Sequence, residues 1–217
     1  MASEGEIARN AATFAKTRME AFSDGVMAIA ITLLVLELAV RPPGSPLEQF
    51  WQAWPSYLAY LVSFLTIGAA WIGHNALTDV LDRADTILLR LNLVFLLVVA
   101  FLPFPTRLIA DAIYEEGIDA ERVAVVVYGL TLLAIRLAFF LMETYARREH
   151  LLIPGADDAD LHDERKKFVF VATGYSITIL LGILAPLAAV GLYFALAIVL
   201  VVPFRSVGQL LAGKQPE

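Results

Sequence analysis

The chain has 217 residues, of which 59% are hydrophobic and 18% are charged, and its mean hydropathy is +0.71. Soluble domains are nearer half apolar and one quarter charged, so the composition indicates a membrane protein. The absence of cysteine excludes a disulfide scaffold and thiolate metal sites. The net charge of −6 argues against nucleic acid as a partner.

The apolar residues gather in stretches that are long enough to cross a bilayer, for which a helix needs roughly 20 residues. No removable signal peptide is expected before the first stretch, which stops at the Arg-Pro-Pro-Gly sequence of residues 41–44. The second follows Trp51 and Trp54, aromatic residues typical of the membrane interface. We predict an all-α membrane protein with six spans at residues 19–40, 57–78, 87–109, 123–146, 168–186 and 188–205.

The last two spans come from one uncharged stretch, Phe168 to Phe204. As a single helix it would be about 55 Å long, nearly twice the thickness of a hydrocarbon core. The stretch must therefore fold back on itself, and Pro186 and Gly191 mark the expected bend.

Basic residues are distributed unequally between the two sides of this arrangement, and cytoplasmic flanks hold the excess of Lys and Arg. The richer side carries Arg9, Lys16, Arg18, Arg83, Arg90, Arg147, Arg148, Arg165, Lys166, Lys167, Arg205 and Lys214, whereas the other carries Arg41, Arg107 and Arg122. Both termini are therefore expected in the cytoplasm. We expect residues 1–217 to form a single membrane domain.

The first span has two different faces at 100° per residue. Glu20 and Asp24 lie nearly opposite an apolar stripe. The stripe consists of Phe22, Gly25, Ile29, Thr32, Leu33, Leu36 and Val40. It is either an ordinary packing surface or the lining of an axis shared by several subunits, where Ile and Leu rings make a constriction that gates by dewetting.

Three sequence stretches carry a resemblance to a known family. They are Arg18-x-x-x-Phe22-Ser23-Asp24 followed by Ala28-Ile29-Ala30-Ile31-Thr32-Leu33-Leu34, then Trp71-Ile72-Gly73-His74-Asn75, and then Asn92-Leu93-Val94-Phe95 with Phe101-Leu102-Pro103-Phe104-Pro105-Thr106. Together they resemble the transmembrane protein 175 family, the potassium channels of lysosomes and their prokaryotic relatives. The resemblance covers all six spans in order.

The resemblance implies a potassium-selective cation channel in which the first helix of each subunit lines the pore. A single copy of the motif resembles the prokaryotic type, a homotetramer in the cell membrane, with lipid and permeant K⁺ as its partners and no cofactor. The constriction then falls on Ile29, Leu33 and Leu36, and Thr32 supplies a hydroxyl ring. Thr173-Gly174-Tyr175-Ser176 only partly resembles a carbonyl filter and is expected to be helix.

The resemblance also implies a polar network behind the pore helix. Its expected members are Arg18, Phe22, Ser23, Asp24, His74 and Asn75. A buried charge is costly without a partner, so the network either positions the pore helix or also senses pH through His74.

Several alternatives stay open. Arg136 inside the fourth span needs a partner in another helix or must snorkel to the interface, and Glu37 is either an attractor for cations or an interfacial carboxylate. No nucleophile motif or phosphate loop indicates an enzyme. The main competing function is a secondary transporter, although such proteins usually show internal repeats, and a membrane subunit without conduction is a further alternative.

Overall fold

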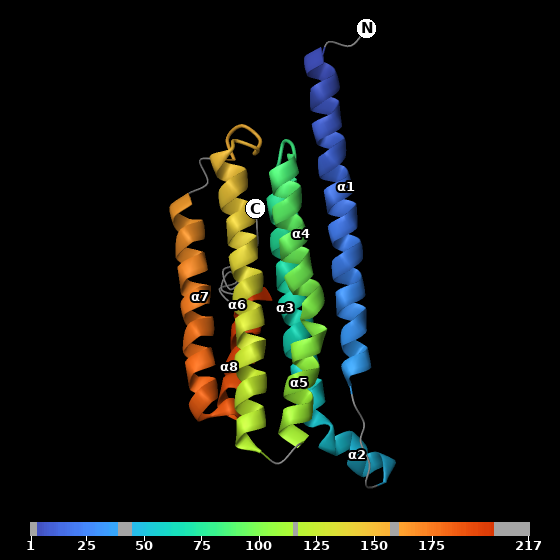
Figure 1. Ribbon diagram of the computed structural model, residues 1–217, viewed down its shortest axis with the longest axis vertical. Helices are drawn as coiled ribbons and strands as arrows, with labels where there is room; N and C mark the ends of the chain where they lie inside the picture. Colours follow the sequence, from blue (N-terminus) through green and yellow to red (C-terminus); the bar gives the residue numbers. More distant parts are fainter. Residues whose placement is uncertain (1–3, 39–44, 115–116, 157–160, 202–217) are drawn as a thin grey trace, which may run out of the picture.

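The computed structural model describes residues 4–38, 45–114, 117–156 and 161–201, which form helices joined by short connections. The elements, labelled in Figure 1, are α1 (Glu4–Leu33), the 3₁₀ helix η1 (Leu34–Glu37), α2 (Pro46–Gln52), α3 (Trp54–Asp79), α4 (Thr86–Phe101), α5 (Pro103–Tyr114), α6 (Ile118–Arg148), α7 (Leu161–Leu184) and α8 (Pro186–Val201). The predicted all-α class is confirmed.

Within the described residues, five helical stretches are long and apolar enough to cross a membrane: Ala15–Glu37, Ser56–Asp79, Thr86–Ala112, Ile118–Arg148 and Arg165–Leu184. They overlap the first five predicted spans. The apolar helix α8 has 16 residues and is therefore about 24 Å long. Residues 202–205 of the predicted sixth span lie outside the described residues, as does Val40 of the predicted stripe.

The chain reverses direction between α7 and α8, as expected for the long uncharged stretch. Helix α7 ends at Leu184 and α8 begins at Pro186, because a proline in the first helical turn has no need of a backbone donor. Gly191 was predicted to share this bend, and that prediction is wrong. It lies inside α8, where a glycine weakens a helix by about 1 kcal/mol without ending it.

The third predicted span is interrupted rather than continuous. Leu102 separates α4 from α5, and its backbone N–H donates to the Val99 carbonyl at 3.1 Å, a tightened turn. Pro103 and Pro105 have no N–H to donate to the carbonyls four residues earlier. The proline pair therefore divides one membrane-crossing segment into two stacked helices.

A short helix that the sequence pattern does not predict, α2, precedes α3 at the membrane-interface tryptophans. Its N-terminus has a capping box in which the Glu48 N–H donates to the Ser45 hydroxyl and the Ser45 N–H donates to the Glu48 carboxylate. The Ser45 backbone N–H, and to a smaller extent the Ser45 hydroxyl, stabilise the charged Glu48 carboxylate and lower its pKa. Trp51 and Trp54 are both exposed, as expected of interfacial anchors.

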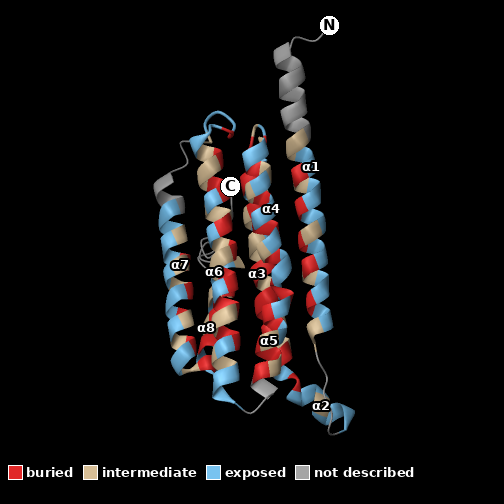
Figure 2. Ribbon diagram, viewed as in Figure 1, coloured by how far each residue is buried: buried red, intermediate tan, exposed pale blue. Residues whose placement is uncertain are grey.

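Helix α1 lies at the edge of the bundle and packs against α3 and α4, whereas α6 contacts α4, α5, α7 and α8 (Figure 1). Figure 2 shows exposed residues along the outer helices α1 and α7 and buried residues concentrated around α3 and α5. The main core includes Met27, Leu34, Phe95, Tyr128 and Tyr193. A second core lies where α3 ends and α4 begins, and includes Met19, Leu81, Leu88, Met142 and Leu152.

Candidate functional site

The apolar stripe of α1 is exposed in the isolated chain. Ile29 is 60% exposed, Leu33 42% and Leu36 71%, and Phe22, Gly25 and Thr32 are exposed beside them. The buried residues of the same segment are Met19, Ser23, Met27, Ala30 and Leu34. The sequence periodicity therefore separated the packed face of α1 from an apolar face that no other part of the described chain covers.

The winding of α1 tightens along this stripe. The helix changes from α to 3₁₀ after Leu33, and residues three apart are eclipsed in 3₁₀ geometry, so the tightening favours alignment of Leu36 with Leu33. The Thr32 hydroxyl donates to the Ile29 carbonyl at 2.8 Å. The Thr32 oxygen can still accept a hydrogen bond, since a hydroxyl carries two lone pairs.

Behind the stripe, three buried side chains tie α1 to its neighbours. The Asn92 amide of α4 donates to the Ser23 hydroxyl at 2.9 Å, and Ser23 donates to the Met19 carbonyl at 2.8 Å. His74 Nε2 of α3 lies 3.0 Å from the Asn92 side-chain oxygen, which can only accept, so His74 is the donor. Ser23 and His74 are fully buried and Asn92 is 2% exposed.

The structure brings together two members of the predicted network. Ser23 and His74 are joined, but through Asn92, which the site prediction omitted although it stood in one of the recognised stretches. The available signal was the one amide in a helix that is apolar from Leu91 onward, where an unpartnered polar group is costly. The His74 ring also stacks on Phe95, with centroids 5.8 Å apart.

Asp24 does not join this buried cluster. It is exposed, and its carboxylate accepts a hydrogen bond from Trp71 Nε1 at 2.9 Å. In the single chain Asp24 lies outside the buried cluster, because a helix at the edge of a bundle leaves more than one face uncovered. Arg18 and Phe22 are also exposed, and Asn75 is half-buried, with its backbone carbonyl accepting from Thr78.

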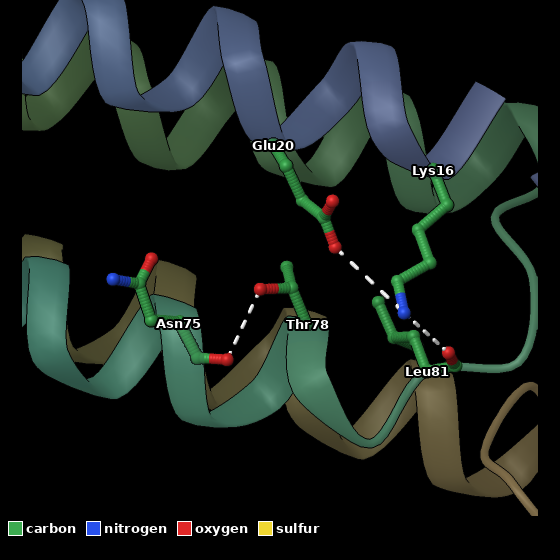
Figure 3. A network of polar contacts seen from close by, with 5 residues as sticks. All are labelled: Lys16, Glu20, Asn75, Thr78 and Leu81. Atoms are coloured by element: carbon green, nitrogen blue, oxygen red, sulfur yellow. Dashed lines mark hydrogen bonds and ion pairs between the residues drawn. The ribbon is translucent and has the colours of Figure 1, made fainter. Parts of the chain in front are cut away.

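A second set of contacts holds the first turns of the α1 span. Lys16 Nζ donates to the Leu81 carbonyl at 2.8 Å and lies 3.7 Å from the Glu20 carboxylate (Figure 3). Leu81 forms an isolated β-bridge with Leu152, and the Asp82 N–H donates to the Leu151 carbonyl at 2.8 Å. Through Lys16, α1 is thus joined to the α3–α4 turn and onward to the loop after α6.

Two ionisable residues whose surroundings were left open have identifiable neighbours. The Glu37 carboxylate lies 3.7 Å from the Arg107 guanidinium on α5. The Arg136 guanidinium carbon lies 5.6 Å from the centroid of Phe139 and 5.9 Å from that of Phe168, within cation–π range. Arg136 thus has contacts in α7, one of the arrangements that the sequence allowed.

Comparison with known proteins places the chain in a family. A family model described as the endosomal/lysosomal potassium channel TMEM175 matches residues 18–103. A potassium channel of Streptomyces collinus is 42% identical over 167 residues, which are 75% of this chain and 80% of that protein. A potassium channel of Chamaesiphon minutus is 37% identical over 188 residues, which are 83% and 91% of the two chains.

The fold agrees as well. The crystal structure of a lysosomal potassium-selective channel TMEM175 homologue from Chamaesiphon minutus superposes with a TM-score of 0.72 and 34% identity, and the match covers 85% of this chain and 95% of that one. The family and these relatives are ion channels, not enzymes. With its sequence stretches, its helix order and its fold all in agreement, the chain belongs to the TMEM175 family of ion channels.

Proposed function

We propose that this protein is a potassium-selective cation channel, built as a homotetramer whose four α1 helices surround a central pore. The observation that carries the proposal is the exposed apolar face of α1, on which Ile29 and Leu36 are 60% and 71% exposed. Relatives named potassium channels match most of this chain. A second copy of α1 across a symmetry axis would cover this face.

In this proposal Ile29, Leu33 and Leu36 form successive apolar rings and Thr32 a hydroxyl ring. An apolar ring offers no oxygen ligands, so an ion must cross it with a strained or partly stripped hydration shell, and a narrow ring also gates by dewetting. Potassium holds its water less tightly than sodium. Such a pore therefore favours potassium moderately and needs no cofactor.

The remaining topology also belongs to the proposal: α8 forms a sixth span, and both termini lie in the cytoplasm of a prokaryotic cell, with the channel in its inner membrane. The basic residues support this orientation, because Arg147, Arg148, Arg165, Lys166 and Lys167 lie near the ends of α6 and α7 that meet at one side. In such a pore the Ser23–Asn92–His74 cluster positions α1. The proposal also assigns His74 a pH-sensing role, which rests on the same contacts.

The test is ion conduction by the purified protein and by Ile29→Asn in planar bilayers under potassium–sodium bi-ionic conditions. An amide at the ring supplies polar atoms where none existed, so we expect higher conductance and a reversal potential shifted toward lower potassium preference. Val35→Asn is the matched control, because Val35 is 51% exposed on the same segment but lies off the stripe. Unchanged currents in Ile29→Asn would remove Ile29 from the pore.

The wild-type recording also separates the alternatives. Single-channel steps that follow the electrochemical gradient support a channel. Saturable flux coupled to a second gradient would instead indicate the secondary transporter, and the absence of any flux would indicate a membrane subunit without conduction.

A further inference from the structure

Three charged side chains meet where α1 gives way to η1. The Glu37 carboxylate of η1 lies 3.7 Å from the Arg107 guanidinium of α5, and Arg107 Nε lies 3.5 Å from the Asp111 carboxylate one turn further along α5. Arg107 therefore stands between two carboxylates that belong to different elements. Together the three side chains carry one net negative charge.

Glu37 lies close to the apolar stripe of α1 but does not belong to it. It directly follows Leu36, which is 71% exposed, and η1 is fixed against the core by Leu34, which is fully buried. The Glu37 side chain is 19% exposed, whereas that of Arg107 is 60% exposed. The carboxylate is thus held beside the stripe, and the guanidinium is the more accessible member of the pair.

Charges in this position act on ions over a distance. In dilute salt a unit charge about 10 Å away changes the local concentration of a monovalent cation roughly twofold. In a symmetric assembly each such charge is repeated in every subunit, so the effects multiply. Salt limits their reach, because the Debye length falls from about 30 Å at 0.01 M to about 3 Å at 1 M ionic strength.

We propose that Arg107 controls the supply of cations to the η1 end of the pore by neutralising Glu37. Without the guanidinium, the net charge of the cluster would change from one to two negative units in each subunit. The charge acts on ion entry and not on the apolar rings, so it changes conductance and not the preference among monovalent cations. The inference rests on the proposed channel, in which η1 of each subunit lies near the central axis.

The competing role for the same ion pair is that of a clamp that holds η1 against α5. Partly exposed ion pairs contribute little to stability, which favours the electrostatic role. The two roles also differ in a measurable way. Removing either partner would release a clamp to the same extent, whereas the loss of Glu37 and the loss of Arg107 change the net charge in opposite directions.

The experiment measures the single-channel conductance of the unaltered full chain, of Glu37→Gln, of Arg107→Gln and of the double variant. Recordings are made in symmetric KCl at about 0.01 M and at about 1 M, where screening is weak and strong. Arg122→Gln is the matched control, because it removes the same charge at the same end of the bundle. Arg122 pairs with Asp119 on α6, and α5 lies between α6 and η1 (Figure 1). Arg41, which lies outside the described residues, is present in every variant.

At the lower salt concentration we expect Arg107→Gln to raise the conductance about twofold or more, and Glu37→Gln to lower it by a similar factor. The double variant keeps one net negative charge and should conduct like the unaltered chain. At the higher salt concentration these four proteins should have similar conductances, because screening removes the field of the cluster. Arg122→Gln should have a much smaller effect at either concentration.

Conductance that falls in both single variants would identify a clamp and overturn the proposal, and so would changes that persist at high salt. An equal rise in Arg122→Gln would also overturn it, because the effect would then not be specific to charge beside η1. Failure of the proposed channel itself is distinguishable from these outcomes. In that case the unaltered chain passes no current and the inference falls with it, whereas failure of the inference alone leaves a conducting chain that does not respond as expected to the charge changes.

Discussion

At the scale of single residues, the buried hydroxyl groups show how tightly the helices away from α1 are packed. The Ser63 hydroxyl lies 2.7 Å from that of Thr106 and 2.9 Å from that of Tyr128. Tyr193 donates to the Val125 carbonyl at 3.2 Å. These bonds join α3, α5, α6 and α8, so polar groups, not only apolar contacts, determine how the helices approach.

Gly129 permits one of these contacts, which gives a prediction. A Cβ on Gly129 would collide with the Tyr193 hydroxyl and lie 2.5 Å from Ile179 Cγ1. Gly129→Ala must therefore displace the buried Tyr193 ring and break its hydrogen bond. We expect a loss of about 1–3 kcal/mol of stability, measured as a lower thermal unfolding temperature in detergent.

The control for this prediction is Gly68→Ala in α3. A Cβ at Gly68 would meet nothing within 4 Å, so the exchange should be neutral or raise the unfolding temperature, because alanine is the better helix former. Equal destabilisation by the two variants would contradict the close packing inferred at Gly129.

The site residues were predictable to the extent that their pattern was periodic. Ile29, Leu33 and Leu36 follow the helix repeat, which placed them together on the exposed face seen in the structure. The partner of Asp24 was not predictable in this way, because Trp71 is 47 residues away and its contact depends on how α3 packs against α1. Periodicity shows which residues share a face of one helix, whereas the hydrogen-bond partner of a side chain depends on how two helices pack together.

At the scale of elements, the sequence located the hydrophobic helices but not every boundary. The long apolar runs were sufficient to locate these helices, because a helix that crosses a bilayer core needs such a run. Helix α2 escaped prediction because its seven residues are too few to show a helical period. The helical turns of α1 that precede the membrane, from Glu4 onward, were missed for a different reason: the predicted spans follow apolar stretches, and this segment is polar.

The attachment of α1 through Lys16 gives an element-scale prediction. Lys16→Met removes the donor to the Leu81 carbonyl but keeps a long apolar stem. The end of α1 should then separate more often from the α3–α4 turn. We expect faster hydrogen exchange for the backbone amides of α1 near Lys16, measured by mass spectrometry on the reconstituted protein.

Glu20→Gln is the matched comparison. It removes the 3.7 Å ion pair with Lys16 and leaves the hydrogen bond to Leu81 in place. Because partly exposed ion pairs contribute little, exchange in α1 should change much less. If hydrogen exchange in α1 increases equally in the two variants, the hydrogen bond from Lys16 to Leu81 holds α1 no more strongly than the ion pair does.

At the scale of the whole molecule, the main issue is whether α8 crosses the membrane. Its 16 residues reach about 24 Å, somewhat less than a hydrocarbon core of roughly 30 Å. A short helix can still span, since the bilayer thins locally at modest cost. The sequence also continues with Val202, Pro203 and Phe204 before the first charge at Arg205. These features support the proposal of six spans over five.

The two topologies differ in where the end of the chain lies, and the absence of native cysteine makes this measurable. Six spans put residue 214 on the same side as the loop after α6, whereas five put it on the opposite side. Glu149→Cys and Lys214→Cys should therefore react with a membrane-impermeant maleimide in inside-out vesicles and be protected in intact spheroplasts. Ser45→Cys, in the connection before α2, should show the reverse pattern.

The pattern of labelling distinguishes an error in span number from an error in orientation. If Lys214→Cys reacts from the side of Ser45→Cys while Glu149→Cys does not, α8 fails to cross and the chain has five spans. If all three positions exchange sides together, the number of spans stands and the orientation inferred from the basic residues is reversed. Glu149 and Ser45 are both exposed in the described structure. A cysteine at either position can therefore react with the maleimide from whichever side of the membrane it faces.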